Sequence, residues 1–128
     1  IPLAIAAPHL HVTLIDKVQK KIAFLTQAKL ELALDNVTCV HARVETLQAS
    51  PFELIVARAF ASLPEFVGLT RHLLAKNGWW CAMKGILPTA EIDELKRSMP
   101  DVRVARTVRL HVPHLNAERH LVLMHVAR

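Results

Sequence analysis

The chain has 128 residues, enough for one domain or part of one. Hydrophobic residues make up 52% of it, which argues against a disordered chain, and no apolar run approaches the about 20 residues of a membrane-spanning helix. The formal net charge of +5 favours a polyanionic partner, whereas the low aromatic content of 5% argues against an open aromatic surface for stacking bases. Cys39 and Cys81 are isolated, so we expect buried thiols in a reducing cytoplasm.

The first half of the chain alternates strand-like and helix-like patterns. In order, we expect a helix end at residues 1–7, a strand at 9–15, a helix at 17–34, a strand at 37–41 and a loop at 42–50. Asp16 is a good N-cap for the helix, and Gln19 occupies its capping-box position.

The second half continues this alternation. It predicts a strand at residues 54–57, a loop at 58–62, a helix at 64–77, a strand at 79–83 and a helix at 89–99. Two final strands are predicted at 102–112 and 120–126. Pro64 is typical of a helix start, and Asn77-Gly78 is typical of a helix end. Pro113 and Asn116 lie between the last two strands, so we expect these strands to pair antiparallel.

Together these patterns predict an α/β fold with a mostly parallel sheet and a C-terminal antiparallel hairpin. Ligands of such sheets bind outside the carboxyl ends of the strands. Arg58 ends the buried run Leu54–Ala57, and its charge is expected either at a site or in an ion pair with Asp16 or Glu45. Asp16 also ends a strand, where a carboxylate can accept hydrogen bonds from ribose hydroxyls or simply cap the next helix.

The segment Arg58–Leu63, reading R-A-F-A-S-L, resembles a segment of the RsmG/GidB family. Five further segments match this family in the same order: Ile1–Ile5, Leu14–Asp16 with Lys20-Lys21 after it, Ala42–Glu45, Ala82–Gly85 and Glu118–Val122. The match covers nearly the whole chain. The glycine-rich stretch that precedes the first segment in the family would lie before Ile1.

The resemblance implies a Rossmann-like methyltransferase fold whose central first strand would lie upstream of Ile1. Residues 1–128 would then be a single methyltransferase domain, incomplete at its N-terminus and inactive alone. The implied reaction is S-adenosylmethionine-dependent methylation of guanine N7 in small-subunit (16S) ribosomal RNA. We expect a cytoplasmic enzyme, monomeric when full length, that acts on RNA either bare or within an assembling ribosomal particle.

The resemblance also implies residue roles. Val44 and Glu45 would contact the adenine end of S-adenosylmethionine, and Arg58 would be another cofactor contact, with a planar guanidinium that suits a carboxylate such as the methionine tail. The strand-end position of Asp16, and not the resemblance, adds it to the expected cofactor residues. Lys84 and Arg119 would contact RNA.

No catalytic residue is assigned, and no metal is expected from the eight histidines, because no accompanying ligand set appears. A nicotinamide-dependent oxidoreductase fragment and an inactive RNA-binding remnant remain as alternatives.

Overall fold

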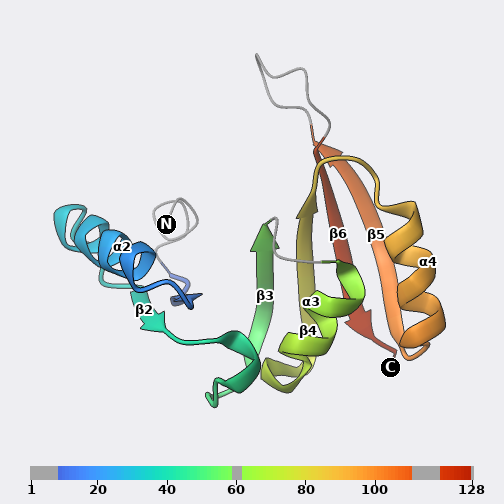
Figure 1. The fold of residues 1–128 in the computed structure, drawn as a ribbon, viewed down its shortest axis with the longest axis horizontal. Coiled ribbons are helices and arrows are strands. Elements are labelled where there is room, and N and C mark those ends of the chain that lie inside the picture. The colour runs from blue at the N-terminus through green and yellow to red at the C-terminus, as the bar shows by residue number, and fades with distance from the viewer. Residues whose placement is uncertain (1–8, 59–61, 111–118, 128) are drawn as a thin grey trace. The chain divides into compact units, whose positions relative to one another are not determined.

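The computed structural model describes residues 9–58, 62–110 and 119–127 (Figure 1). The chain divides into two compact units, Ile1–Leu47 and Gln48–Arg128, and each is described by itself. The helix end expected at residues 1–7 lies outside the described residues, as does the loop between the last two strands. Within the described part of the chain, no helix has the length and apolar character needed to cross a membrane.

The first unit contains a two-stranded parallel sheet. β1 (Val12–Asp16) pairs in register with β2 (Val37–His41), and α2 (Gln19–Glu31) connects them. Ile22 is the buried residue of α2 among those described. Both predicted strands are confirmed, and the helix between them is shorter than predicted.

The predicted N-cap of α2 is wrong. Val18 occupies the N-cap position, without a side-chain cap, and the helix begins at Gln19, so no capping box forms there. Asp16 instead accepts a hydrogen bond from the Val18 N–H, with an Oδ1–N distance of 2.9 Å. This local turn competes with helical hydrogen bonding and delays the start of the helix.

The second unit contains a four-stranded sheet of order β3-β4-β6-β5. Its elements, in chain order, are β3 (Phe52–Arg58), α3 (Leu63–Thr70), β4 (Leu74–Lys84), α4 (Thr89–Ser98), β5 (Val102–Leu110) and β6 (Arg119–Val126). β3 and β4 are parallel, and β6 pairs antiparallel with both β4 and β5. The predicted α/β class with parallel strands and a C-terminal antiparallel hairpin is therefore confirmed.

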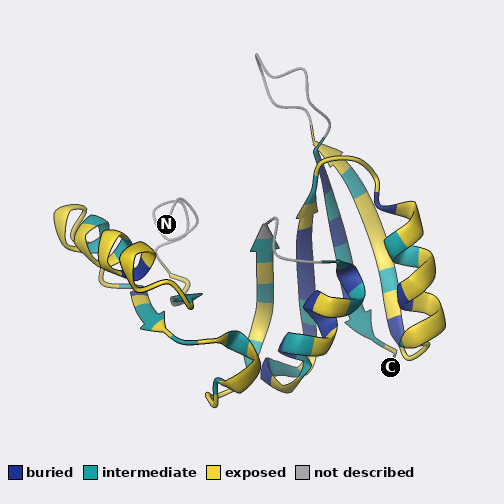
Figure 2. Cartoon of the chain, viewed as in Figure 1, coloured by how far each residue is buried: buried dark blue, intermediate teal, exposed yellow. Residues whose placement is uncertain are grey.

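Helices α3 and α4 pack on one face of this sheet, where the core of the unit lies. On β6 the even-numbered residues His120, Val122 and Met124 are buried and their odd-numbered neighbours are half-buried, which is the period-two pattern of a strand with one covered face. Figure 2 shows the buried positions concentrated on the two central strands and on α3. The core cluster contains Leu63, Phe66, Val67, Trp80, Ala82, Leu95, Val102, Val122 and Met124.

β4 begins earlier than predicted, because the predicted helix 64–77 ends at Thr70 and a 3-10 turn, η2 (Arg71–Leu73), leads directly into the strand. Pairing with β3 jumps from Phe52–Leu74 to Leu54–Trp79, so the backbone bulges between them. Within this bulge Asn77 has a φ of 66°, and a Cβ on Gly78 would lie 2.8 Å from the Ala75 carbonyl oxygen. The Asn77-Gly78 pair therefore shapes an irregularity inside a strand and does not end a helix.

A short chain of hydrogen bonds crosses the core. The Trp80 indole N–H donates to Thr70 Oγ1 at 3.0 Å, and the Thr70 hydroxyl donates to the Phe66 carbonyl oxygen at 2.6 Å. Trp80 is 0% exposed and Thr70 is 1% exposed, so neither group can bond to water instead. The Trp80 indole N–H and the Thr70 hydroxyl thus both have hydrogen-bond partners inside the protein.

We expect Thr70→Val to lower the free energy of unfolding by about 1–3 kcal/mol, because the isosteric change leaves the buried indole N–H without an acceptor. Urea denaturation measures the change. In a Trp80→Phe background the same substitution should cost much less, since no indole N–H remains. An equal cost in both backgrounds would contradict this account.

Candidate functional site

The predicted cofactor residues of the first unit lie at one end of its sheet. Asp16 ends β1, and its carbonyl oxygen accepts a hydrogen bond from the Ala42 N–H, 3.0 Å away, directly after β2. A short 3-10 turn, Val44–Thr46, follows and carries Val44 and Glu45. Glu45 lies 3.8 Å from the Arg43 guanidinium in an exposed ion pair. Asp16 therefore ends one strand, and Val44 and Glu45 lie on the turn that follows the neighbouring parallel strand.

A cavity of about 350 Å³ opens beside Asp16. The side chains that line it are Asp16, Lys20, Lys21, Phe24 and Leu25. Asp16 Oδ2 is 4.0 Å from Lys21 Nζ, and 29% of the Asp16 side chain is exposed, so its carboxylate can still accept further hydrogen bonds. A carboxylate beside aromatic and aliphatic side chains suits a nucleoside, which presents hydroxyls and a flat ring.

The predicted residues of the second unit also meet at one edge. Arg58, at the end of β3, is in register with Met83, so Arg58 and Lys84 terminate neighbouring parallel strands. Lys84 pairs across with His120, which places Arg119, the first residue of β6, at the same edge. The backbone therefore brings Arg58, Lys84 and Arg119 together.

Glu91, in the first turn of α4, joins this edge to α3. Its Oε1 atom lies 2.9 Å from Lys84 Nζ and also accepts a hydrogen bond of 2.9 Å from the Leu63 N–H. Only 17% of the Lys84 side chain and 32% of the Glu91 side chain are exposed. Water screens this pair less than an ordinary surface ion pair, so we expect it to contribute more to stability.

Two further hydrogen bonds lie beside the residues that Glu91 contacts. Leu63 opens α3, whose N-cap residue Ser62 accepts a hydrogen bond from the Glu65 N–H at 3.4 Å. After β4, the His120 ring donates through Nδ1 to the Gly85 carbonyl oxygen at 3.0 Å. Glu91 thus ties the end of R-A-F-A-S-L to Lys84.

Sequence reasoning did not single out Glu91. The available signal was an acid in the first turn of a predicted helix, which is ordinarily interpreted as a complement to the helix dipole.

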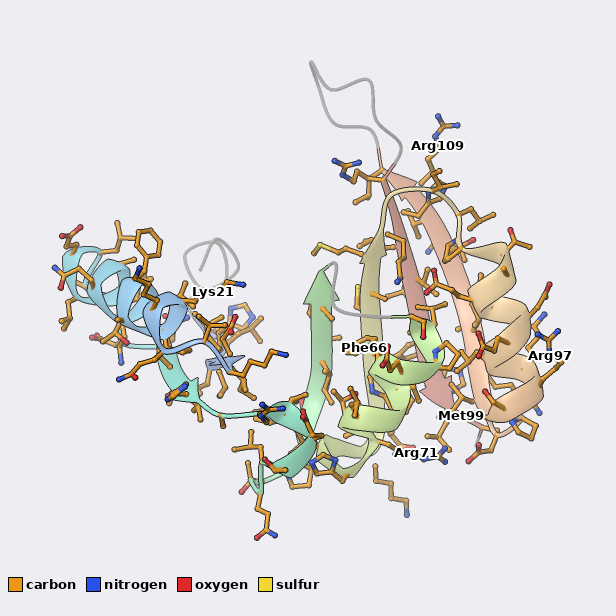
Figure 3. The ribbon with its side chains drawn as sticks, in the orientation of Figure 1. Lys21, Phe66, Arg71, Arg97, Met99 and Arg109 are labelled. Carbon is orange, nitrogen blue, oxygen red and sulfur yellow. The ribbon has the colours of Figure 1, made fainter. Side chains whose placement is uncertain are left out.

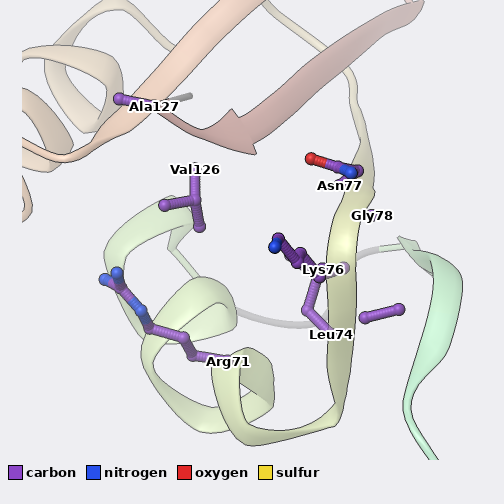
Figure 4. A pocket seen from close by; sticks show the side chains of 8 residues that line it. Arg71, Leu74, Lys76, Asn77, Gly78, Val126 and Ala127 are labelled. Carbon is purple, nitrogen blue, oxygen red and sulfur yellow. The ribbon is translucent and has the colours of Figure 1, made fainter.

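A larger cavity, of about 550 Å³, lies at the other end of β4 (Figure 4). Leu74, Ala75, Lys76, Asn77 and Gly78 line it, with Arg71, Val126 and Ala127. Arg71 donates to Asp101 Oδ1 at 3.2 Å, and this hydrogen bond raises the pKa of Arg71 and lowers the pKa of Asp101. Because ligands of α/β sheets bind at the carboxyl ends of strands, we assign no function to this cavity.

No metal centre is evident in the described ranges: no three His, Cys, Asp or Glu side chains there are grouped so that they could hold a metal ion.

We expect Glu91→Gln to lower the free energy of unfolding by about 1 kcal/mol through the lost attraction to Lys84. Glu91→Ala should cost about 1 kcal/mol more, because the Leu63 N–H then loses its acceptor as well. Chemical denaturation measures both changes. Glu94→Gln is the matched control, an exposed acid on the same helix, and should change little. If the Glu91 and Glu94 variants behave alike, the contacts of Glu91 do not stabilise this edge.

Comparison with solved structures agrees with the fold. The chain resembles a ribosomal protein L11 methylase from Lactobacillus delbrueckii subsp. bulgaricus with a TM-score of 0.73 and 14% identity, covering 99% of this chain and 65% of that one. It also resembles the N-methyltransferase NodS from Bradyrhizobium japonicum WM9, with a TM-score of 0.66 and 13% identity, covering 95% and 77% of the two chains. The predicted methyltransferase fold is confirmed.

Sequence comparison identifies the family. The chain is 48% identical over 124 residues to ribosomal RNA small subunit methyltransferase G of Neisseria meningitidis serogroup C, which covers 97% of this chain and 58% of that protein. It is 50% identical over 123 residues to the same-named protein of Laribacter hongkongensis, covering 95% and 58%. The chain therefore spans a little over half the length of these relatives.

The family model for GidB, described as rRNA small subunit methyltransferase G, matches residues 1–122. Because the matching family is described as a methyltransferase, the alternative of a nicotinamide-dependent oxidoreductase fragment is not favoured. The resemblance inferred from the R-A-F-A-S-L segment and its companions is confirmed, and the chain belongs to the GidB family.

Proposed function

We propose that the protein with this chain is an S-adenosylmethionine-dependent methyltransferase that modifies guanine N7 in small-subunit (16S) ribosomal RNA. The observation that carries the proposal is the family match over residues 1–122, and it is supported by the positions of Asp16, Arg58 and Lys84 at the ends of parallel strands. The protein acts in the cytoplasm as a monomer, and its two compact units are parts of one methyltransferase domain.

The residues of the first unit suit the nucleoside end of the cofactor. Asp16 would accept hydrogen bonds from the ribose hydroxyls, because a carboxylate offers two acceptors to neighbouring hydroxyl groups. Phe24, which is 73% exposed at the adjacent cavity, offers an apolar surface for a flat ring. Val44 and Glu45, on the turn after β2, would contact the adenine edge through a backbone N–H and a carboxylate.

The second unit supplies positive charge. Arg58 would bind the methionine carboxylate, for which its planar guanidinium allows two parallel hydrogen bonds. Lys84 and Arg119, at the same edge of the sheet, would contact the RNA. Glu91 holds Lys84 in place for this contact.

The chemistry requires alignment of two substrates. When bound, S-adenosylmethionine supplies a methyl group on a positively charged sulfur, which the in-plane lone pair of guanine N7 can accept without loss of a proton. A general base is therefore not needed, and the protein contributes by holding both substrates in a reactive orientation. Within each unit the candidate residues lie at or just after one end of the sheet, which is consistent with this requirement.

In the complete protein, Arg58→Ala should weaken S-adenosylmethionine binding by about 1.5–3 kcal/mol, through loss of a charge-assisted hydrogen bond. Titration calorimetry measures the affinity. Arg97→Ala, which removes an exposed arginine from α4, is the control and should leave the affinity unchanged. Unaltered cofactor affinity in a folded Arg58→Ala variant would refute the assigned role.

Lys84→Ala and Arg119→Ala should each reduce RNA affinity and the steepness of its salt dependence, because each removes a phosphate contact, while cofactor affinity stays nearly constant. Lys76→Ala provides a matched control, since Lys76 is an exposed lysine near the other end of β4. Filter binding of a small-subunit RNA transcript over a series of salt concentrations is the measurement. Normal RNA binding by both variants would show that neither side chain contacts the RNA.

A further inference from the structure

The C-terminal hairpin is basic throughout its described strands. β5 and β6 contain Arg103, Arg106, Arg109 and Arg119, and neither strand contains an aspartate or a glutamate. A strand pair that carries charge of only one sign complements a partner of the opposite sign. The hairpin is therefore a candidate surface for a polyanion.

A β-bulge decides where two of these arginines project. Arg103 is opposite His125 on β6, and Arg106 is opposite Leu123, with the register shift between Val104 and Arg106. His125 and Leu123 are two residues apart and so project from the same face of the sheet. Arg103 and Arg106 therefore share that face, although in a regular strand residues three apart would project from opposite faces.

This shared face is the one turned away from the core. Arg119 has the same odd-numbered phase on β6 as Leu123 and His125, whereas the even-numbered residues of β6 are buried in the core. At about 3.3 Å per residue, the positions from Arg119 to Arg103 extend about 20 Å along the strands, with Arg106 between them. We call Arg103, Arg106 and Arg119 the arginine face.

The charges of Arg103 and Arg106 are available to a partner. Both residues are exposed, and no ion pair joins either of them to a carboxylate within the described ranges. The nearest acid in sequence, Asp101, is engaged by Arg71. Phosphates of a nucleic acid are the partner that such charges suit, because they are regularly spaced and carry no neutralising group.

We propose that the arginine face binds phosphates of the substrate RNA and guides the RNA toward the end of the sheet where Arg119 lies beside Lys84. This inference rests on the proposed function and adds a second contact region along the sheet. The arginines of an edge strand such as β5 have an alternative use, which is to prevent edge-to-edge pairing with another molecule. The experiment separates the two roles.

The test compares three double variants of the complete protein. Arg103→Gln with Arg106→Gln removes two charges from the arginine face, and Arg103→Lys with Arg106→Lys keeps both. Lys96→Gln with Arg97→Gln removes two exposed charges from α4, which packs on the core side of the sheet, with Arg97 projecting away from the sheet (Figure 3). Binding of a small-subunit RNA transcript is measured over a series of salt concentrations, alongside cofactor affinity, methyl transfer, melting temperature and light scattering.

The glutamine pair should bind RNA about 10- to 30-fold more weakly near 0.1 M salt, and its salt slope should fall by about 1.4, the value for two phosphate contacts to a single strand. Cofactor affinity and melting temperature should remain as in the unmodified protein. The lysine pair should keep the salt slope, and the α4 pair should lose much less affinity than the glutamine pair.

Three results would overturn the proposal: an unchanged slope for the glutamine pair, an equal loss for the α4 pair, or unchanged RNA binding with increased aggregation. The last would assign the arginines to edge protection. If the unmodified protein neither binds the RNA nor methylates it, the proposed function itself fails. If the unmodified protein methylates normally and the glutamine pair matches its salt slope, only the arginine face fails.

Discussion

The position of β4 between a parallel neighbour and an antiparallel neighbour is the constraint on which the second unit depends. Parallel pairing with β3 sends the ends of both strands, Arg58 and Lys84, to one edge, and antiparallel pairing brings the start of β6 to the same edge. Burial of Trp80 and Ala82 holds the register, because a slip of one residue would move these side chains to the opposite face. The convergence of basic residues thus follows from how the core packs.

Glu91 connects this packing to the candidate site. One carboxylate oxygen meets both the Lys84 ammonium and the Leu63 N–H, so α4, β4 and α3 share a single acceptor. A half-buried lysine with a fixed partner loses less conformational freedom when it meets a ligand than a lysine on an exposed helix does. The same contact can therefore serve stability and the proposed contact of Lys84 with RNA.

Charge and polarity divide between the described parts of the chain in a way that suits two different ligands. In the first unit, Asp16 ends β1 beside a cavity that Phe24 also lines, and Glu45 lies on the turn that follows β2. Such carboxylates and an aromatic ring suit the hydroxyls and base of a nucleoside. In the second unit, Lys84 and the arginine face offer positive charge to phosphates. The two faces of the sheet of the second unit differ, since one is buried under α3 and α4 and the other carries the arginine face.

Much of this protein was determined by its sequence alone. Apolar runs and turn residues placed the strands at 12–16 and 37–41 and the helix at 89–98 to within a few residues, because such patterns depend only on local periodicity. The R-A-F-A-S-L segment and its five companion segments also indicated the family, which the family model confirms.

Tertiary structure alone decided the other features. Local signals at Asn77-Gly78 indicated a helix end, yet pairing with β3 extended β4 back to Leu74, because strand partners distant in sequence override local preference. The roles of Glu91 and of the bulge before Arg106 depend equally on partners far away along the chain. Spacing within β5 cannot reveal which face an arginine occupies, since that face is set by the strand it pairs with.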